Sequence, residues 1–280
     1  MEKYNKTIWI VVIVIAVVGI GFGTYYLIYK KPPAPPAPTP PAEVTEEQPA
    51  PVPAEEPISE EERRLQEELL RLGLDDSDNM VRQLAQGLSS HPQLSVWLKN
   101  EDLLRKFTAV VDNIATSSSP RSHIKFLAPK GDFHIMEKNG LTYIDPDSFN
   151  RYNLAANVFT SLDAEDCAKL YHQAKPLVQE AYQDLGYPAK DFQQTLTKAI
   201  IELLKTPLVE GDIQLEKKVI TYMMVDPKLE QLSPAQKQLL RMGPENVRKI
   251  QAKLREIALA LGIPESQIPQ SVVYYTRKIY

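Results

Sequence analysis

A run of 21 residues without a charged side chain, Ile8 to Ile28, constrains the folding of this chain more than any other feature. As a helix rising about 1.5 Å per residue, the run would be about 30 Å long, the thickness of a bilayer's hydrocarbon layer. Trp9 lies at one end, and Lys30 and Lys31 follow the other, as is typical of a membrane-spanning helix. The run therefore predicts a single transmembrane helix whose partner is the lipid bilayer.

A cleaved signal peptide is the competing interpretation of the same run. Its apolar region would be about 7–15 residues long and would end in small residues. This run is longer and ends in Tyr25 and Tyr26, which favours a retained anchor. The lysines on its two sides are balanced, but the short N-terminal flank favours export of the rest of the chain. A domain that faces the cytoplasm is the alternative.

Residues 32–57 hold 11 of the chain's 23 prolines, together with five glutamates. Proline fixes φ and removes a backbone donor, so this segment favours extended polyproline II at about 3.1 Å per residue. We predict a solvated spacer. A ligand for a proline-recognition domain is the alternative, because dense prolines also create Pro-x-x-Pro spacing. The predicted domains are thus 1–31, the flank and membrane helix; 32–57, the linker; and 58–280, a globular domain.

The globular part is nearly neutral, since residues 63–280 hold 28 basic and 27 acidic side chains. This balance argues against nucleic-acid binding, which relies on a basic footprint. Cys167 is the chain's one cysteine and excludes an internal disulfide framework or a cysteine-built zinc site.

Helix signals dominate this part of the chain. Ser59 is placed to cap a first helix, and Asn100 is placed to begin another. The apolar positions between Ser161 and Gly186 form one helical face that passes through Pro176. Ser233, Pro234 and Gln236 form a capping box, Gly243 is placed to stop that helix, and Pro244 to open the next.

Strand signals are fewer. Phe133–Met136 and Leu141–Ile144 flank Asn139-Gly140, which favours a hairpin turn. Ile213–Met224 is predicted to add one strand. The predicted fold class is a membrane-anchored, mainly α (α+β) protein, with one transmembrane helix, a Pro-rich linker, and a helical globular domain containing one small antiparallel β element.

Several strings together resemble a bacterial family known as domain of unknown function 3014, over about residues 70–262. These strings are LDDSD (74–78), VDN (111–113), PR (120–121), RY (151–152), SLDAED (161–166), AYQDLGYP (181–188) and LSPAQKQLLRMGPENVRKIQAKL (232–254). The resemblance implies the same three-part layout and a bacterial source. The expected location is the inner membrane, with a periplasmic C-terminal domain. The family implies no activity, ligand or catalytic residue.

The chain carries no recognisable catalytic or phosphate-binding motif, and we predict no catalytic residue, metal site or cofactor. Cys167 lies on the apolar face of its helix and is interpreted as a core residue. Asp75–Asn79 resembles a calcium loop only superficially, and helix capping accounts for it better. The alternative function is a glycan-directed envelope hydrolase, whose site would be built from scattered carboxylates. The candidates are Asp145, Asp147, Asp163, Glu165 and Asp166.

The segment most suggestive of a binding surface is basic. Between positions 237 and 255 it contains six basic residues and one acidic residue, Glu245. Its candidate contacts with an anionic partner are Lys237, Arg241, Arg248 and Lys249. The plainer interpretation is the solvated side of two amphipathic helices.

Arg121, Arg151 and Tyr152 form a second candidate groove near the predicted hairpin. The alternative is structural: an arginine here would cap a helix end or pair with Asp145 and Asp147. The chain as a whole is predicted to be a non-enzymatic interaction or scaffold module. Its expected partner is an envelope protein, a glycan or a lipid headgroup.

Overall fold

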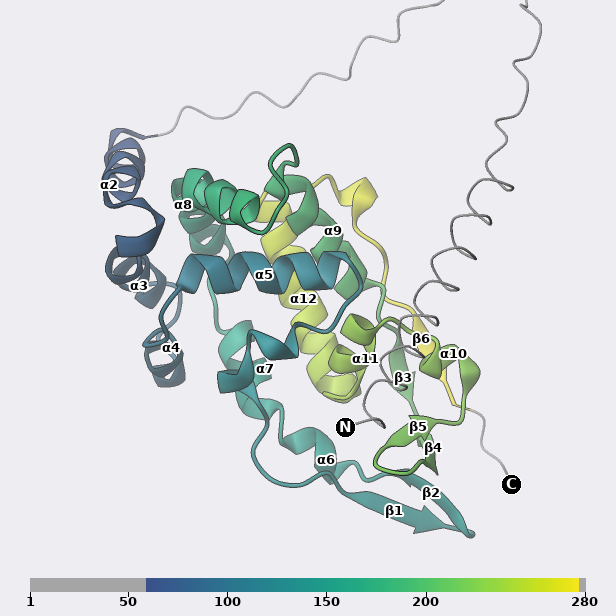
Figure 1. The fold of residues 1–280 in the computed structure, drawn as a ribbon. Helices are drawn as coiled ribbons and strands as arrows, with labels where there is room; N and C mark the ends of the chain where they lie inside the picture. The colour runs from purple at the N-terminus through teal and green to yellow at the C-terminus, as the bar shows by residue number, and fades with distance from the viewer. Residues whose placement is uncertain (1–58, 277–280) are drawn as a thin grey trace, which may run out of the picture. The chain divides into compact units, whose positions relative to one another are not determined.

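The computed structural model describes residues 59–276. Helices make up most of this part, and two small sheets lie toward one end of the helical body (Figure 1). The first helices are α2 (Glu60–Asp76), α3 (Asp78–Gln86), α4 (Pro92–Trp97) and α5 (Leu103–Ala115). The short 3₁₀ turns are Pro120–Ser122, Lys125–Leu127 and Glu265–Gln267.

Ser59 caps α2, as its sequence predicts. The Glu62 N–H donates to Ser59 Oγ at 3.2 Å, and the Ser59 N–H donates to the Glu62 carboxylate at 3.0 Å. The helix kinks at Gly73, where φ is 69° and ψ is 176°. The chain beyond the kink turns inward, so Leu74 is buried.

Helix α5 begins at Leu103 and not at Asn100, because its cap comes from another helix. Asp78 of α3 accepts hydrogen bonds from the backbone N–H groups of Asp102 at 2.7 Å and Leu103 at 2.9 Å. Asp102 adopts a left-handed conformation with φ 55° to present these groups. Asp78 therefore caps a helix, which is the role predicted for its acidic cluster.

The main core lies among α2, α5, α8 (Ala164–Asp184), α9 (Phe192–Leu204) and α12 (Pro244–Ala260). Helix α8 is continuous through Pro176, as predicted, and α7 (Asn153–Thr160) packs against α12. The largest side chains with less than 2 % exposure in this core are Tyr182, Phe192, Leu69, Leu177 and Leu204.

The capping box at Ser233 is present at the start of α11 (Pro234–Leu240). Gln236 N–H donates to Ser233 Oγ at 3.1 Å, and Ser233 N–H donates to Gln236 Oε1 at 3.2 Å. Gly243, with φ 84°, lies between α11 and α12, and Pro244 opens α12. These boundaries match the predicted ones.

Four antiparallel strands form the larger sheet in the order β1-β2-β4-β5. Its strands are β1 (Ile135–Lys138), β2 (Leu141–Ile144), β4 (Gln214–Lys217) and β5 (Tyr222–Met224). The predicted hairpin is confirmed, although Glu137 and Lys138 belong to the strand, so that Asn139-Gly140 alone makes the turn. The segment 213–224 was predicted as one strand, and it forms the second hairpin.

A second, two-stranded sheet corrects the prediction of a single β element. Strand β3 (Leu208–Glu210) pairs in parallel with β6 (Val273–Tyr275), and Leu208 is opposite Val273. Apolar side chains from both sheets pack with α10 (Pro227–Glu230) and α11 in a smaller core. That core contains Ile144, Val209, Ile213, Leu215, Met224, Leu229 and Leu240. The short helix α6 (Asp147–Asn150) follows β2.

The predicted fold class needs one further correction, because it included a transmembrane helix. Among residues 59–276, no helix combines the length and the apolar character needed to cross a bilayer. The described fold is a mainly helical α+β domain. The expected span, Ile8 to Ile28, and the linker at 32–57 lie outside the described residues.

Candidate functional site

The four basic residues predicted to contact an anionic partner lie on α11, at its end and on α12. Lys237 is mostly covered, with a side chain 19 % exposed. Its Nζ donates to the Glu230 carboxylate and to the Glu230 carbonyl, both at 2.9 Å. Lys237 therefore joins α11 to the end of α10.

Glu230 connects this pair to the larger sheet, since its carboxylate also accepts the Met224 N–H at 2.9 Å. Burial disfavours the ionised form of Glu230. Even so, the hydrogen bonds from Lys237 and Met224, with the charges of Lys237 and Arg241, lower its pKa below the usual value. The arrangement favours a charged Glu230 that holds β5 against α11.

Arg248 and Lys249 also have carboxylate partners. Arg248 reaches Glu210 of β3 at 2.8 Å, and Lys249 reaches Glu245 one turn earlier on α12 at 2.7 Å. Arg241 is exposed. Three of the four predicted residues thus already share their charge with a carboxylate, and their use by an anionic partner stays a prediction.

Arg151 contacts the end of α6, as its structural alternative predicts, and also the loop before β1. Its guanidinium donates to the Ser148 carbonyl at 3.0 Å and the Gly131 carbonyl at 3.2 Å. The same group lies 5.7 Å from the ring centre of Phe133 and 5.5 Å from that of Tyr152. Arg121 is exposed in the 3₁₀ turn Pro120–Ser122.

The five carboxylates considered for hydrolysis lie at the starts of two different helices. Asp145 accepts the Asp147 N–H at 2.9 Å ahead of α6. Asp163 accepts the Asp166 N–H at 2.9 Å as the cap of α8, whose first turn contains the remaining acids. Among residues 59–276, no three His, Cys, Asp or Glu side chains are grouped so that they could hold a metal ion.

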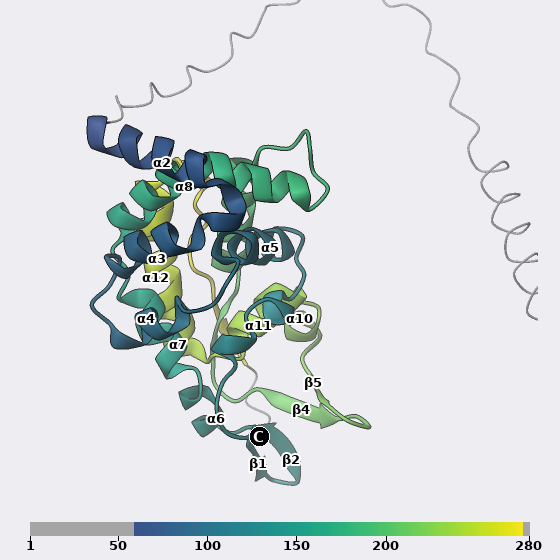
Figure 2. The same ribbon diagram turned by 60° about the vertical axis from the view of Figure 1, so that its left-hand side comes forward.

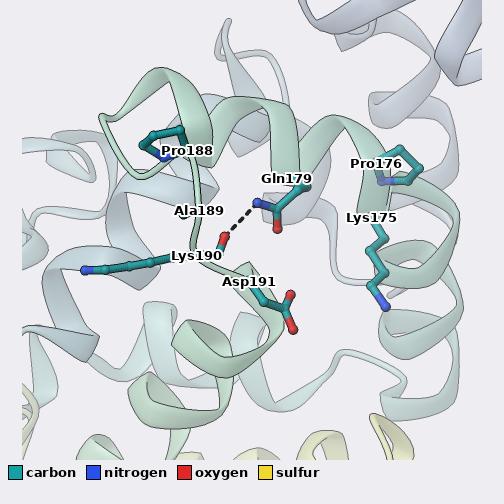
Figure 3. Close-up of a pocket in the computed structure, with 7 residues that line it drawn as sticks. All are labelled: Lys175, Pro176, Gln179, Pro188, Ala189, Lys190 and Asp191. Carbon is teal, nitrogen blue, oxygen red and sulfur yellow. Dashed lines mark hydrogen bonds between the residues drawn. The ribbon is translucent and has the colours of Figure 1, made fainter.

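A shallow hollow lies between the end of α8 and the start of α9 (Figure 3). Its lining residues are Lys175, Pro176, Gln179, Pro188, Ala189, Lys190 and Asp191. Gln179 donates to the Lys190 carbonyl at 2.8 Å and accepts the Phe192 N–H at 2.9 Å, so it closes the loop. Asp191 caps α9, and Lys190 lies 4.3 Å above the Tyr187 ring. Much of the polar lining therefore has a structural role.

Near this hollow, Asp112 of α5 faces Tyr187 in a contact that the sequence did not suggest. The Tyr187 hydroxyl donates to the Asp112 carboxylate at 3.5 Å, and its ring stacks on Tyr182 with centres 4.8 Å apart. Burial raises the pKa of Asp112, although the hydrogen bond from Tyr187 opposes the shift. The two residues join α5 to the α8–α9 connection.

Cys167 is partly buried on α8, and this burial raises the pKa of its thiol to about 11. At pH 8 the folded chain should contain about 100-fold less thiolate than a free cysteine would. We therefore expect iodoacetamide to label Cys167 much more slowly in the folded chain than in urea, with a rate that rises toward pH 11. Mass spectrometry of timed reactions measures this. Equal rates in the two states would contradict the buried-thiol interpretation.

Among residues 59–276, the most exposed large apolar side chains lie at the tip of the β4–β5 hairpin. Val219 is 96 % exposed and Ile220 is 95 % exposed. Figure 2 shows this hairpin projecting beyond the helices. The sequence does not reveal this tip, because two adjacent β-branched residues are typical of a strand interior. Lys217-Lys218 directly before them was the one local signal that the strand ends there.

Comparisons with known proteins agree with the resemblance described above. A search of curated proteins found no match, and a search of solved structures found none either. The family model described as "Protein of unknown function (DUF3014)" matches residues 103–258, which is more than half of the chain. This chain therefore belongs to the DUF3014 family.

Proposed function

We propose that residues 59–276 form a non-enzymatic interaction module that docks through the tip of the β4–β5 hairpin. The observation that carries this proposal is the nearly complete exposure of Val219 and Ile220. Large aliphatic side chains lose favourable burial energy when they stay in water, about 1.5–3 kcal/mol each. Met223 of β5 and Val225 just after that strand are only 38 % and 45 % exposed, so the two tip residues differ clearly from the apolar residues that follow them.

The neighbouring hairpin of the same sheet supplies an internal comparison. Its turn is Asn139-Gly140, with φ 54° and 73°, which is the pair that a two-residue hairpin favours. The β4–β5 hairpin is also narrow, since the Lys218 N–H donates to the Thr221 carbonyl at 2.8 Å. Two β-branched residues lie between that bonded pair. Neither has a positive φ, but Asn, Asp, Ser and Gly are commoner at such turn positions.

Val219 and Ile220 thus break a local rule, and they bury almost none of their own surface in this domain. Residues that depart from local preferences without a structural gain are expected at functional sites. Val219 and Ile220 themselves carry no nucleophile, base or metal ligand, so their exposure suits docking better than catalysis.

Site-specific photocrosslinking in intact cells tests this proposal. A photoreactive amino acid replaces Ile220 in the full-length chain, and adducts are identified after irradiation by mass spectrometry. We expect a discrete set of adducts. Their yield should fall severalfold when Val219 is also changed to Thr, which keeps the β-branched shape and removes apolar surface.

The matched control carries the same photoreactive group in place of Val96 on α4, whose side chain is 51 % exposed. We expect the control to give few adducts and to be insensitive to Val219→Thr. Equal adducts from both positions, or none from Ile220, would contradict docking through the hairpin tip.

A further inference from the structure

We propose that the surface contacted by the β4–β5 tip is an anionic phospholipid layer, with Val219 and Ile220 entering its headgroup boundary and Lys217 and Lys218 contacting the headgroups. This inference rests on the proposed function, because it names the partner of the same site. Figure 2 shows the geometric basis, a narrow hairpin whose tip extends away from the helices.

The size and shape of the tip favour a lipid surface over a protein surface. A stable protein interface covers about 800 Å² on each partner and places a contiguous apolar patch at its centre. Here only two adjacent aliphatic side chains are exposed at the hairpin tip, and the exposed residues Lys217, Lys218 and Thr221 flank them in the sequence. A fluid lipid layer needs no complementary shape and accommodates a convex apolar tip about 5–10 Å deep.

The charges around the tip favour an anionic lipid layer in particular. Lys218 pairs with Glu216 at 2.7 Å on the same hairpin. Lys217 is exposed, and within residues 59–276 no carboxylate pairs with it. Residues 216–221 thus have a net charge of +1. Basic residues beside an inserted apolar group are attracted to anionic headgroups, and long lysine side chains keep their ammonium groups in the polar layer.

Two aliphatic side chains make this contact weak and reversible, because even a single myristoyl chain gives only marginal membrane binding. The tip therefore orients the domain at a lipid surface and does not anchor it there. Because the apolar contact is weak, the attraction of the headgroups for Lys217, whose charge no carboxylate of residues 59–276 shares, should matter as much as the apolar pair.

A fluorescent probe at the tip tests this inference in the full-length chain. Ile220→Cys is combined with Cys167→Ser, and the new thiol is labelled with the environment-sensitive dye NBD. Because the dye reports only its own surroundings, contacts made by residues 1–58 do not produce the signal. With vesicles of phosphatidylcholine and phosphatidylglycerol we expect a blue shift and a severalfold rise in emission. Vesicles of phosphatidylcholine alone should give a much smaller change.

Two comparisons make the result specific. The same label on Val96→Cys should stay in water with both kinds of vesicle. In the tip-labelled chain, Lys217→Gln with Lys218→Gln should raise the anionic lipid concentration needed for half the signal about tenfold. Circular dichroism confirms that each labelled variant retains its helices.

Each remaining outcome overturns the lipid inference. It fails if the tip label stays in water with anionic vesicles, if the Val96 label responds equally, or if neutral vesicles give the same signal. The proposed function survives such a failure if photocrosslinking from Ile220 in cells still gives protein adducts that depend on Val219. It falls as well if those adducts are absent.

Discussion

Replacing Gln251 with Leu is expected to lower the free energy of unfolding by about 2–4 kcal/mol, although leucine suits a buried helix position. Gln251 lies on α12 and is 0 % exposed. Its side-chain amide donates to the carbonyls of Leu203, Leu204 and Thr206 at 3.3, 3.2 and 2.8 Å. These carbonyls lie where α9 ends and the chain leads into β3, and leucine offers them no donor.

Urea denaturation followed by far-UV circular dichroism measures the change. Gln194→Leu is the matched control, because Gln194 lies on the exposed side of α9. This control should change the free energy of unfolding by less than about 0.5 kcal/mol. If Gln251→Leu is as stable as the control, the three carbonyls must find other donors. The hydrogen bonds of Gln251 would then not be needed to hold the end of α9 against α12.

Gln251 also shows why part of this fold can be predicted from the sequence and part cannot. The caps at Ser59 and Ser233 were predicted because each cap and its partner lie three residues apart in the chain. The carbonyls that accept from the Gln251 amide lie 45 to 48 residues away. No local pattern reveals partners so far away in the sequence. Gln251 therefore looks like a polar residue misplaced in the apolar stripe of α12.

The same limit explains the missed features of the sheets. The parallel pairing of β3 with β6 joins Leu208 to Val273 across 65 positions, and neither three-residue strand has a pattern of its own. Asp78 caps α5 from 24 residues away, which is why the start of α5 was misplaced. At the β4–β5 tip the local preference was itself misleading, because Val and Ile favour strands wherever they lie.

The candidate basic residues show the same limit of local patterns, while their use by an anionic partner stays a prediction. Residues 237–255 do carry a net charge of +5 when counted along the sequence. The carboxylates of Glu210 and Glu230, however, come from other elements and pair with Arg248 and Lys237. Charge patterns along one segment predict a surface only when no distant segment supplies the opposite charge.

Gly243→Ala is expected to be the other strongly destabilising change, lowering the free energy of unfolding by about 2–5 kcal/mol. Gly243 has φ 84° and ψ 158°, a backbone region essentially restricted to glycine. A Cβ at this position would also lie 2.5 Å from Cγ and 2.7 Å from Cδ2 of Phe149. Backbone strain of about 1–3 kcal/mol and overpacking of about 1–3 kcal/mol both contribute.

Gly73→Ala separates these two contributions. Gly73 has nearly the same conformation, with φ 69° and ψ 176°, but a Cβ there would meet no atom within 4 Å. We expect Gly73→Ala to lower the free energy of unfolding by the backbone strain alone. Urea denaturation of both variants then gives the additional loss caused by Phe149 in Gly243→Ala. Adding Phe149→Ala to Gly243→Ala should recover only the part due to the ring, because alanine keeps the Phe149 Cβ, which would lie 2.7 Å from the new Cβ. This part is the coupling energy in a double-mutant cycle. Equal losses for the two glycines, with no coupling to Phe149, would mean that the α11–α12 junction shifts to make room. The close contact between Gly243 and Phe149 would then contribute nothing to holding α6 against the α11–α12 junction.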